Sequence, residues 1–113
     1  MVNRFDMKRA ARVDDNQPEI VNALRQIGCS VQPLHAVGRG VPDLLVGVAG
    51  VNLLLEVKDG NKTPSEQKLT KTQEAWHAEW VGQKAIVRSV EEAINLVYGM
   101  QSISSLKKAV CPA

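Results

Sequence analysis

The segment 42–58, PDLLVGVAGVNLLLEVK, limits the possible folds of this chain more than any other part of the sequence. Two apolar runs flank an Ala-Gly dipeptide at 49–50, a pattern that predicts a β-hairpin with a two-residue turn. Centring the hairpin on this turn sets its register, which pairs Val48 with Val51, Leu45 with Leu54 and Asp43 with Glu56. Because successive side chains of a strand point to opposite faces, Glu56 and Lys58 are expected on the same face as Asp43.

Two acidic residues in this hairpin create an electrostatic problem. Carboxylates that face each other across a strand pair repel, so a positive charge is expected between Asp43 and Glu56. A hard divalent cation fits best, and the backbone carbonyl of Val57 is a further candidate oxygen ligand. The alternative is that Asp43, Glu56 and Lys58 lie at fraying strand ends, where charges protect a sheet edge from aggregation. Three charges on one face of leucine-rich strands favour the metal site.

Phosphodiester hydrolysis is the chemistry that this set of side chains suits. A divalent cation polarises a phosphoryl group and lowers the pKa of water. Lys58 can orient that water or neutralise the charge that develops on phosphorus. Positively charged residues close by in the sequence could follow a nucleic-acid backbone, namely Arg39, Lys62, Lys68 and Lys71. For each of them, an ordinary solvated surface position is the alternative.

Length and composition describe one ordinary globular domain. The chain has 113 residues, 44% hydrophobic and 23% charged, and its net charge of +2 permits an anionic partner without requiring one. No apolar h-region of a secretory signal follows the N-terminal charges, and the longest apolar run, 44–51, is too short to span a bilayer. Cys29 and Cys111 form neither a metal spacing nor a disulfide framework. A cytoplasmic location is therefore expected.

The chain before the hairpin predicts one helix and one strand. Asn16 resembles an N-cap, with Pro18 in the first turn and Glu19 three residues later, as in a capping box. Apolar residues then recur at helical spacing, at Ile20, Val21, Leu24 and Ile27. Gly28 ends this helix, and residues 29–34 predict a short strand. Glu19 has two interpretations, a cap that interacts with the helix dipole or a third carboxylate that reaches the metal.

A second helix is expected after the hairpin. Thr70 and Gln73 form a capping box, and the helix continues to about Trp80. Gln73, Trp76, His77 and Trp80 fall on one face, so both tryptophans are expected to pack in the core. Gln73 could reach a substrate or an attacking water, although its capping role alone would explain it. His77 is interpreted as a partly buried structural histidine rather than a metal ligand or general base, because no second histidine is nearby.

The remaining pattern completes an α/β fold. Residues 59–68 are polar and contain Gly and Pro, which predicts a mobile loop. Residues 84–88 predict a strand, and Ser89 caps a last helix that ends near Tyr98. The order is helix, three strands, helix, strand and helix, so we expect a mixed sheet flanked by helices.

Short motifs within these elements resemble a nuclease family. Pro42-Asp43, followed by Glu56-Val57-Lys58, is similar to the PD-(D/E)xK motif of the restriction-endonuclease-like nucleases. The resemblance extends to flanking residues, namely Gly38-Arg39-Gly40-Val41, Asp59-Gly60, Leu69-Thr70 with Gln73, and Val87-Arg88-Ser89-Val90-Glu91-Glu92. Together they resemble the VRR-nuc branch, in particular its small stand-alone phage and bacterial members. The match covers about residues 16–97, and the expected element order agrees with the αβββαβ core of that superfamily.

The resemblance implies an endodeoxyribonuclease that depends on Mg²⁺ or Mn²⁺. Asp43 and Glu56 would hold the metal, and Lys58 would be the catalytic lysine. Glu19 would match the acidic residue of the first helix, which helps to hold the metal directly or through water. Gln73 would match the polar residue that the catalytic set takes from the helix after the motif. Stand-alone members are regarded as homodimers that cut branched DNA, such as four-way (Holliday) junctions, and leave 5′-phosphate and 3′-hydroxyl ends.

On this interpretation residues 16–99 form the nuclease domain, between a basic N-terminal arm at 1–15 and a C-terminal tail at 100–113. Two other functions stay open. The fold could be a non-catalytic nucleic-acid-binding or assembly subunit of a phage recombination or packaging complex, although the intact acidic and lysine set argues against this. The substrate could also be RNA, since a phosphate held by a metal looks alike in both nucleic acids and only a contact to the 2′-hydroxyl would separate them.

Overall fold

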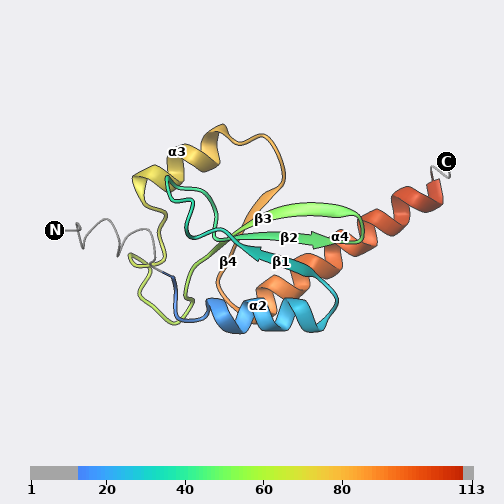
Figure 1. The fold of residues 1–113 in the computed structure, drawn as a ribbon, viewed down its shortest axis with the longest axis horizontal. Helices are drawn as coiled ribbons and strands as arrows, with labels where there is room; N and C mark the ends of the chain where they lie inside the picture. Colours follow the sequence, from blue (N-terminus) through green and yellow to red (C-terminus); the bar gives the residue numbers. More distant parts are fainter. Residues whose placement is uncertain (1–12, 111–113) are drawn as a thin grey trace.

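The computed structural model describes residues 13–110, and Figure 1 shows their arrangement. Within this range the chain forms three helices and four strands, in the order predicted from the sequence. They are α2 (Gln17–Gln26), β1 (Ser30–Pro33), β2 (Leu44–Val48), β3 (Val51–Val57), α3 (Lys71–Glu79), β4 (Lys84–Val87) and α4 (Val90–Val110). Most of the expected N-terminal arm, residues 1–12, and the chain end at 111–113 lie outside the described residues.

The four strands form one mixed sheet in the order β1-β2-β3-β4. β1, β2 and β3 pair antiparallel, and β4 joins the edge of β3 in parallel. A parallel neighbour requires a crossover connection, and α3 with its flanking loops provides it. The expected α/β fold, a mixed sheet flanked by helices, is therefore confirmed.

The hairpin has the predicted register and turn. Val48 pairs with Val51 and Leu45 with Leu54. Ala49 and Gly50 both have positive φ angles, 50° and 78°. Two successive positive φ angles are the mark of a primed hairpin turn, whose twist matches that of the flanking strands.

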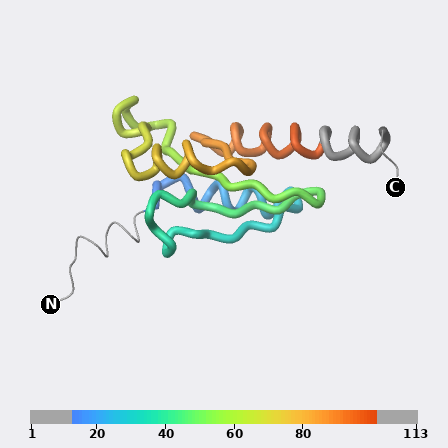
Figure 2. The backbone as a smooth tube through the Cα atoms, turned by 90° about the horizontal axis from the view of Figure 1, so that it is seen from above, coloured from blue at the N-terminus to red at the C-terminus, as the bar shows by residue number. Residues whose placement is uncertain are grey.

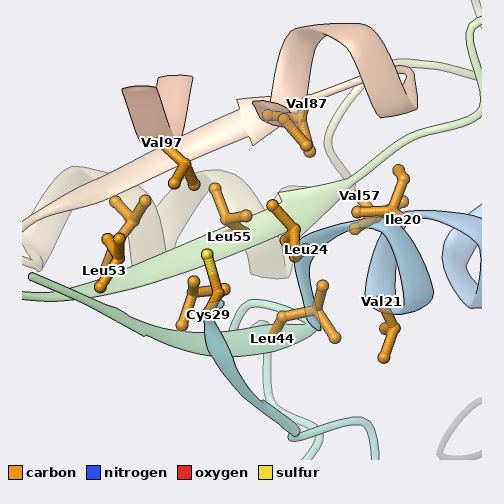
Figure 3. Close-up of a cluster of buried hydrophobic side chains, with 13 residues drawn as sticks. Ile20, Val21, Leu24, Cys29, Leu44, Leu53, Leu55, Val57, Val87 and Val97 are labelled. Atoms are coloured by element: carbon orange, nitrogen blue, oxygen red, sulfur yellow. The ribbon is translucent and has the colours of Figure 1, made fainter. Parts of the chain in front are cut away.

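α2 and α4 cover one face of the sheet and enclose the core, which Figure 3 shows in close-up. In β3, Leu53, Leu55 and Val57 point into this core, as the period of two requires. They meet alternate residues of β2 and the apolar face of α2, including Ile20, Val21, Leu24, Leu44, Val46 and Val48. Each such buried side chain stabilises the fold by roughly 1.5–3 kcal/mol. The opposite face therefore receives Glu56 and Lys58.

The polar segments of the chain gather at one end of the sheet. Figures 1 and 2 show the loops 34–43 and 59–70 at the end opposite the hairpin turn. Gly40 (φ 80°) brings the first of these loops against α3, because a Cβ atom on Gly40 would lie 2.5 Å from the carbonyl oxygen of Thr72. The absence of a side chain there sets the distance between the start of β2 and the start of α3.

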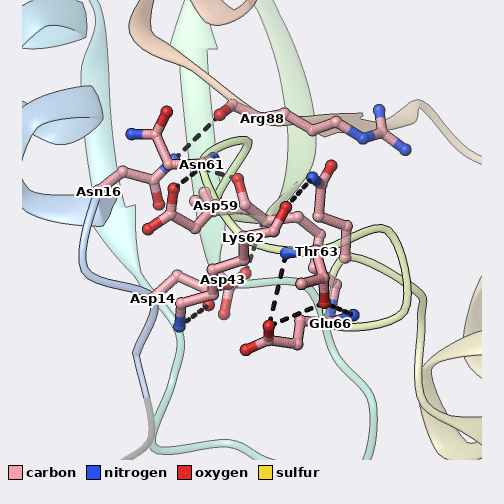
Figure 4. Close-up of polar contacts among 12 residues, drawn as sticks. Asp14, Asn16, Asp43, Asp59, Asn61, Lys62, Thr63, Glu66 and Arg88 are labelled. Atoms are coloured by element: carbon pink, nitrogen blue, oxygen red, sulfur yellow. Dashed lines mark hydrogen bonds and ion pairs between the residues drawn. The ribbon is translucent and has the colours of Figure 1, made fainter.

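The capping box predicted for α2 is wrong. Asn16 is the N-cap residue, but its side chain makes no capping hydrogen bond. Its backbone is already helical (φ −84°, ψ −6°), whereas a side-chain cap normally requires an extended N-cap. The Asn16 amide instead donates to the backbone carbonyls of Lys58 (3.1 Å) and Arg88 (3.2 Å), as Figure 4 shows for Arg88. The side chain thus joins α2 to the ends of β3 and β4.

The tryptophans of α3 do not lie in the core, contrary to the prediction. No residue of α3 is fully buried, and Trp80 is 44% exposed. The rings of Trp76 and Trp80 stack on each other, with centroids 4.9 Å apart. The reason is that α3 lies over the polar end of the sheet, where Gln73 and His77 contact Glu56 and the tryptophans fall to the side.

The last helix is longer than predicted. α4 runs from Val90 to Val110, whereas the sequence suggested an end near Tyr98 and a separate tail from residue 100. A single glycine at position 99 weakens a helix by only about 1 kcal/mol, and the first proline after it is Pro112. No helix within residues 13–110 is both long and apolar enough to cross a membrane.

Candidate active site

The structure brings Asp43, Glu56 and Lys58 to the same end of the sheet, on the face away from the core. Glu56 is 1% exposed and Lys58 is 7% exposed. Asp43 lies just outside β2, because the β2–β3 pairing ends at Leu44 and Leu55. The sequence predicted that Asp43 would pair with Glu56 across the two strands, but Asp43 is not part of the ladder. Its Oδ2 atom instead accepts a hydrogen bond from the Val57 amide at 2.7 Å, which fixes the carboxylate beside β3.

The environment of Glu56 strongly disfavours its charged form. Burial raises the pKa of Glu56 to about 9, and the hydrogen bond and negative charge of Asp43 add to the effect. Lys58 lowers that pKa but does not compensate. Without a cation, Glu56 is therefore protonated at neutral pH. A divalent cation between the two side chains would reverse this balance, because an opposite charge at close range favours ionisation.

Gln73 connects the lysine to the acid. Its Oε1 atom accepts a hydrogen bond from Lys58 Nζ at 2.9 Å, and its Nε2 atom donates to Glu56 Oε2 at 3.3 Å. Gln73 Oε1 also accepts a hydrogen bond from the backbone amide of Thr70. In return, the Thr70 hydroxyl accepts one from the backbone amide of Gln73. The predicted capping box is confirmed. The Gln73 side chain thus caps α3 and also fixes the relative positions of Lys58 and Glu56.

His77 is a member of the cluster that the sequence interpretation set aside. Its side chain is partly buried, as expected, with 10% of its surface exposed, and Nε2 lies 3.7 Å from Glu56 Oε1. Neither atom has a hydrogen-bond partner in the described part of the chain. Burial lowers the pKa of His77, so at neutral pH both groups are uncharged without a cation and the contact is not an ion pair. The available signal was its position one helical turn after Gln73, on the same face.

Glu19, the predicted third metal ligand, is not brought to the cluster. It is exposed in the first turn of α2, and no hydrogen bond or ion pair within residues 13–110 joins it to Asp43 or Glu56. The nearby acid is Asp14, whose charge contributes to the raised pKa of Glu56. Burial raises the pKa of Asp14 itself, and its Oδ1 atom lies 3.7 Å from Lys62 Nζ (Figure 4). Asp14 belongs to the segment 1–15, for which the sequence predicts a basic arm and no role at the metal.

The four residues predicted to contact nucleic acid differ in their exposure. Arg39, Lys68 and Lys71 are exposed, whereas Lys62 is partly buried beside Asp14. Arg39 has a positive φ angle of 57°, which is uncommon for a residue with a side chain.

The loop 59–68, which the sequence predicts to be mobile, contains several internal hydrogen bonds. Asp59 Oδ1 accepts from the amide of Asn61 at 2.9 Å, and the hydroxyl of Thr63 donates to Glu66 at 2.8 Å (Figure 4). Gln67 crosses the loop from its far end and bonds two backbone carbonyls. A separate bond, from the backbone amide of Gly60 to the carbonyl of Arg88 at 3.0 Å, joins the loop to the end of β4.

The oxygen donors at the cluster fit Mg²⁺. The N–H and C=O of one strand residue point to the same side, so the Val57 carbonyl points to the side where its amide meets Asp43. Asp43, Glu56 and this carbonyl then offer oxygen ligands. No group of three or more His, Cys, Asp or Glu side chains able to hold an ion occurs in residues 13–110. Two carboxylates suffice for Mg²⁺, which retains several waters and takes substrate phosphate oxygens.

No protein-family model, curated protein or solved structure matches this chain.

Proposed function

We propose that this protein is a Mg²⁺- or Mn²⁺-dependent endodeoxyribonuclease of the VRR-nuc type that hydrolyses phosphodiester bonds. The observation that carries the proposal is the pair of carboxyl groups, Asp43 and Glu56, with the Lys58 amine held beside them through Gln73. A buried acid whose pKa rises to about 9 next to a second acid is a costly arrangement, and a cation bound between them would account for it.

Each residue of the cluster has a distinct part in this proposal. Asp43, Glu56 and the carbonyl of Val57 would hold the metal. When bound, the metal would neutralise charge on the phosphate and lower the pKa of the attacking water. Lys58 has three N–H donors, and Gln73 occupies one of them. The others can bond a phosphate oxygen or the water, so that Lys58 stabilises the negative charge that grows in the transition state.

Gln73 and His77 act on the cluster as positioning residues. Gln73 holds the Lys58 amine at hydrogen-bonding distance, which limits its rotation before substrate binds. His77 closes the side of Glu56 that faces α3, and its ring excludes water from the Oε1 atom. The acid is thus held in one orientation.

The substrate side of the proposal follows from charge and family likeness. Exposed Arg39, Lys68 and Lys71 lie on the segments that flank the cluster and can contact phosphates. Because this sequence resembles stand-alone VRR-nuc proteins, we extend the proposal to a homodimer that cuts branched DNA such as four-way junctions.

The test is cleavage of labelled four-way junction, flap, nicked and linear DNA in Mg²⁺, Mn²⁺ or EDTA. The wild-type protein should cut only with a divalent cation. Asp43→Ala, Glu56→Ala and Lys58→Ala should each lower cleavage by about a hundredfold or more while DNA binding persists. Glu19→Ala is the matched control, because this exposed acid lies outside the cluster, and it should cut like the wild type. Full activity in any of the three cluster variants would contradict the proposal.

A further inference from the structure

A pocket of about 340 Å³ lies between the loop 59–70 and strand β4. Its walls are Pro64, Gln67, Lys68, Leu69, Ile86 and Arg88. Small-molecule sites in proteins usually occupy roughly 300–1,000 Å³, so this pocket has the size for one nucleotide and not for a duplex.

The pocket adjoins the candidate active site. Ile86 is the register partner of Glu56 in the β3–β4 pair, so the two side chains leave the same face of the sheet. Leu69 directly precedes Thr70, the residue that caps α3 and bonds Gln73. A ligand group in the pocket would therefore contact β4, the strand next to β3, at the level of Glu56.

The lining combines apolar side chains with two positively charged ones, Lys68 and Arg88, and with the side-chain amide of Gln67. Leu69 and Ile86 provide aliphatic surface, and Arg88 provides a guanidinium group at its side. That group is only loosely engaged, since Nη1 lies 4.0 Å from the Glu92 carboxylate and both side chains are exposed. The Gln67 Nε2 group donates to the carbonyls of Gly60 (3.3 Å) and Lys62 (2.7 Å). The Gln67 carbonyl oxygen is therefore the atom that can accept from a ligand.

We propose that this pocket holds an unpaired nucleotide next to the phosphate that is cut. The base would lie against Leu69 and Ile86, and Lys68 and Arg88 would contact its phosphate. Every nucleobase has an N–H donor on its pairing edge, which a duplex keeps occupied and an unpaired base offers to Gln67. The pocket thus selects unpaired nucleotides with little base preference. This inference rests on the proposed nuclease function and names the kind of DNA that the same site would take.

The experiment measures DNA binding in EDTA, where cleavage is excluded. The probes are a short single-stranded oligonucleotide with one 2-aminopurine and the same oligonucleotide in a duplex. Arg88→Ala and Leu69→Ala are the test variants. Arg25→Ala is the matched control, because Arg25 is an exposed arginine on α2, across the sheet from the pocket.

Wild-type protein should bind the single strand and raise 2-aminopurine fluorescence, because the base leaves its stack. Arg88→Ala should weaken single-strand binding roughly five- to tenfold, with duplex binding almost unchanged. Leu69→Ala should reduce the fluorescence change, and Arg25→Ala should behave like the wild type. Equal weakening for both probes, or no difference from Arg25→Ala, would overturn the pocket proposal.

A parallel cleavage assay in Mg²⁺ separates this proposal from the proposed function. If the wild type cuts DNA while the pocket variants bind like Arg25→Ala, the pocket proposal fails and the nuclease stands. If the pocket variants lose single-strand binding selectively but no metal supports cleavage, the nucleotide pocket stands and the nuclease fails. Absence of any DNA binding by the wild type overturns both.

Discussion

Glu56 is buried beside Asp43, and this position determines how its ionisation affects stability. In the unfolded chain Glu56 titrates near 4.5, whereas in the folded, metal-free protein its pKa is about 9. Between these values the folded state holds a proton that the unfolded state has lost. The contribution of Glu56 is therefore fully present below pH 4.5 and declines as pH rises toward 9.

The change Glu56→Gln should therefore stabilise the metal-free protein increasingly as pH rises. In EDTA, the melting temperature of the variant minus that of the wild type should be small near about pH 5 and clearly positive near about pH 8, since the amide never ionises. Thermal unfolding followed by circular dichroism measures this difference. Glu19→Gln, which changes an exposed acid, should show no such trend. A difference that does not vary with pH would show that Glu56 ionises normally in the fold.

The helix α3 links the fold to the site because its first turn contains Gln73 and its second contains His77. The same Gln73 side chain caps the helix, bonds Lys58 and bonds Glu56. The helix buries no residue completely, so these polar contacts position it rather than apolar packing.

Replacing Gln73 with alanine should therefore reduce both stability and cleavage. Thr70→Ala is the matched variant, because it removes the other half of the capping box and leaves Lys58 in contact with Gln73. Each change should cost about 1 kcal/mol of stability in urea unfolding. Only Gln73→Ala should lower the cleavage rate, by about tenfold or more, because the lysine is no longer oriented. Equal cleavage rates in the two variants would show that Gln73 acts only as a helix cap.

The close packing of the loop 34–43 on α3 can be tested at Gly40. Gly40→Ala places a methyl group against the Thr72 carbonyl and forces a residue with a side chain to keep φ at 80°. The two effects should together cost about 2–5 kcal/mol in urea unfolding. Gly38→Ala has a similar φ of 69° but nothing within 4 Å, so it should cost only about 1–2 kcal/mol. Similar losses in both variants would mean that the loop does not pack tightly on α3.

At the scale of the whole molecule, the fold was predictable where local patterns decide the structure. The dipeptide at 49–50 fixed the hairpin register, and alternation in β3 separated the core residues from Glu56 and Lys58. The predictions failed where the burial of a helix face depends on which part of the sheet it packs against. Helical spacing shows that Trp76 shares a face with Gln73, but not that this face meets the polar end of the sheet.

Long-range partners were also beyond the sequence. Asn16 bonds Lys58 and Arg88, which are distant in the chain, and no local pattern signals those contacts. Asp14 lies close enough for its charge to act on Glu56, while Glu19, which matched the expected motif, points to solvent. The proximity of Asp43 and Glu56 was predictable because Asp43 directly precedes β2 and Glu56 lies in β3. A turn and a period of two determine the geometry of that hairpin.

If Asp43 and Glu56 form a divalent-cation site, as we claim, calorimetric titration of the protein with Mn²⁺ will detect the binding. Glu56 holds a proton at neutral pH without metal and must lose it to bind the ion. Titrations in buffers with different heats of ionisation should therefore show saturable binding with release of about one proton per ion. Glu56→Gln should abolish both signals. Absence of Mn²⁺ binding, or unchanged binding in Glu56→Gln, would contradict the claim.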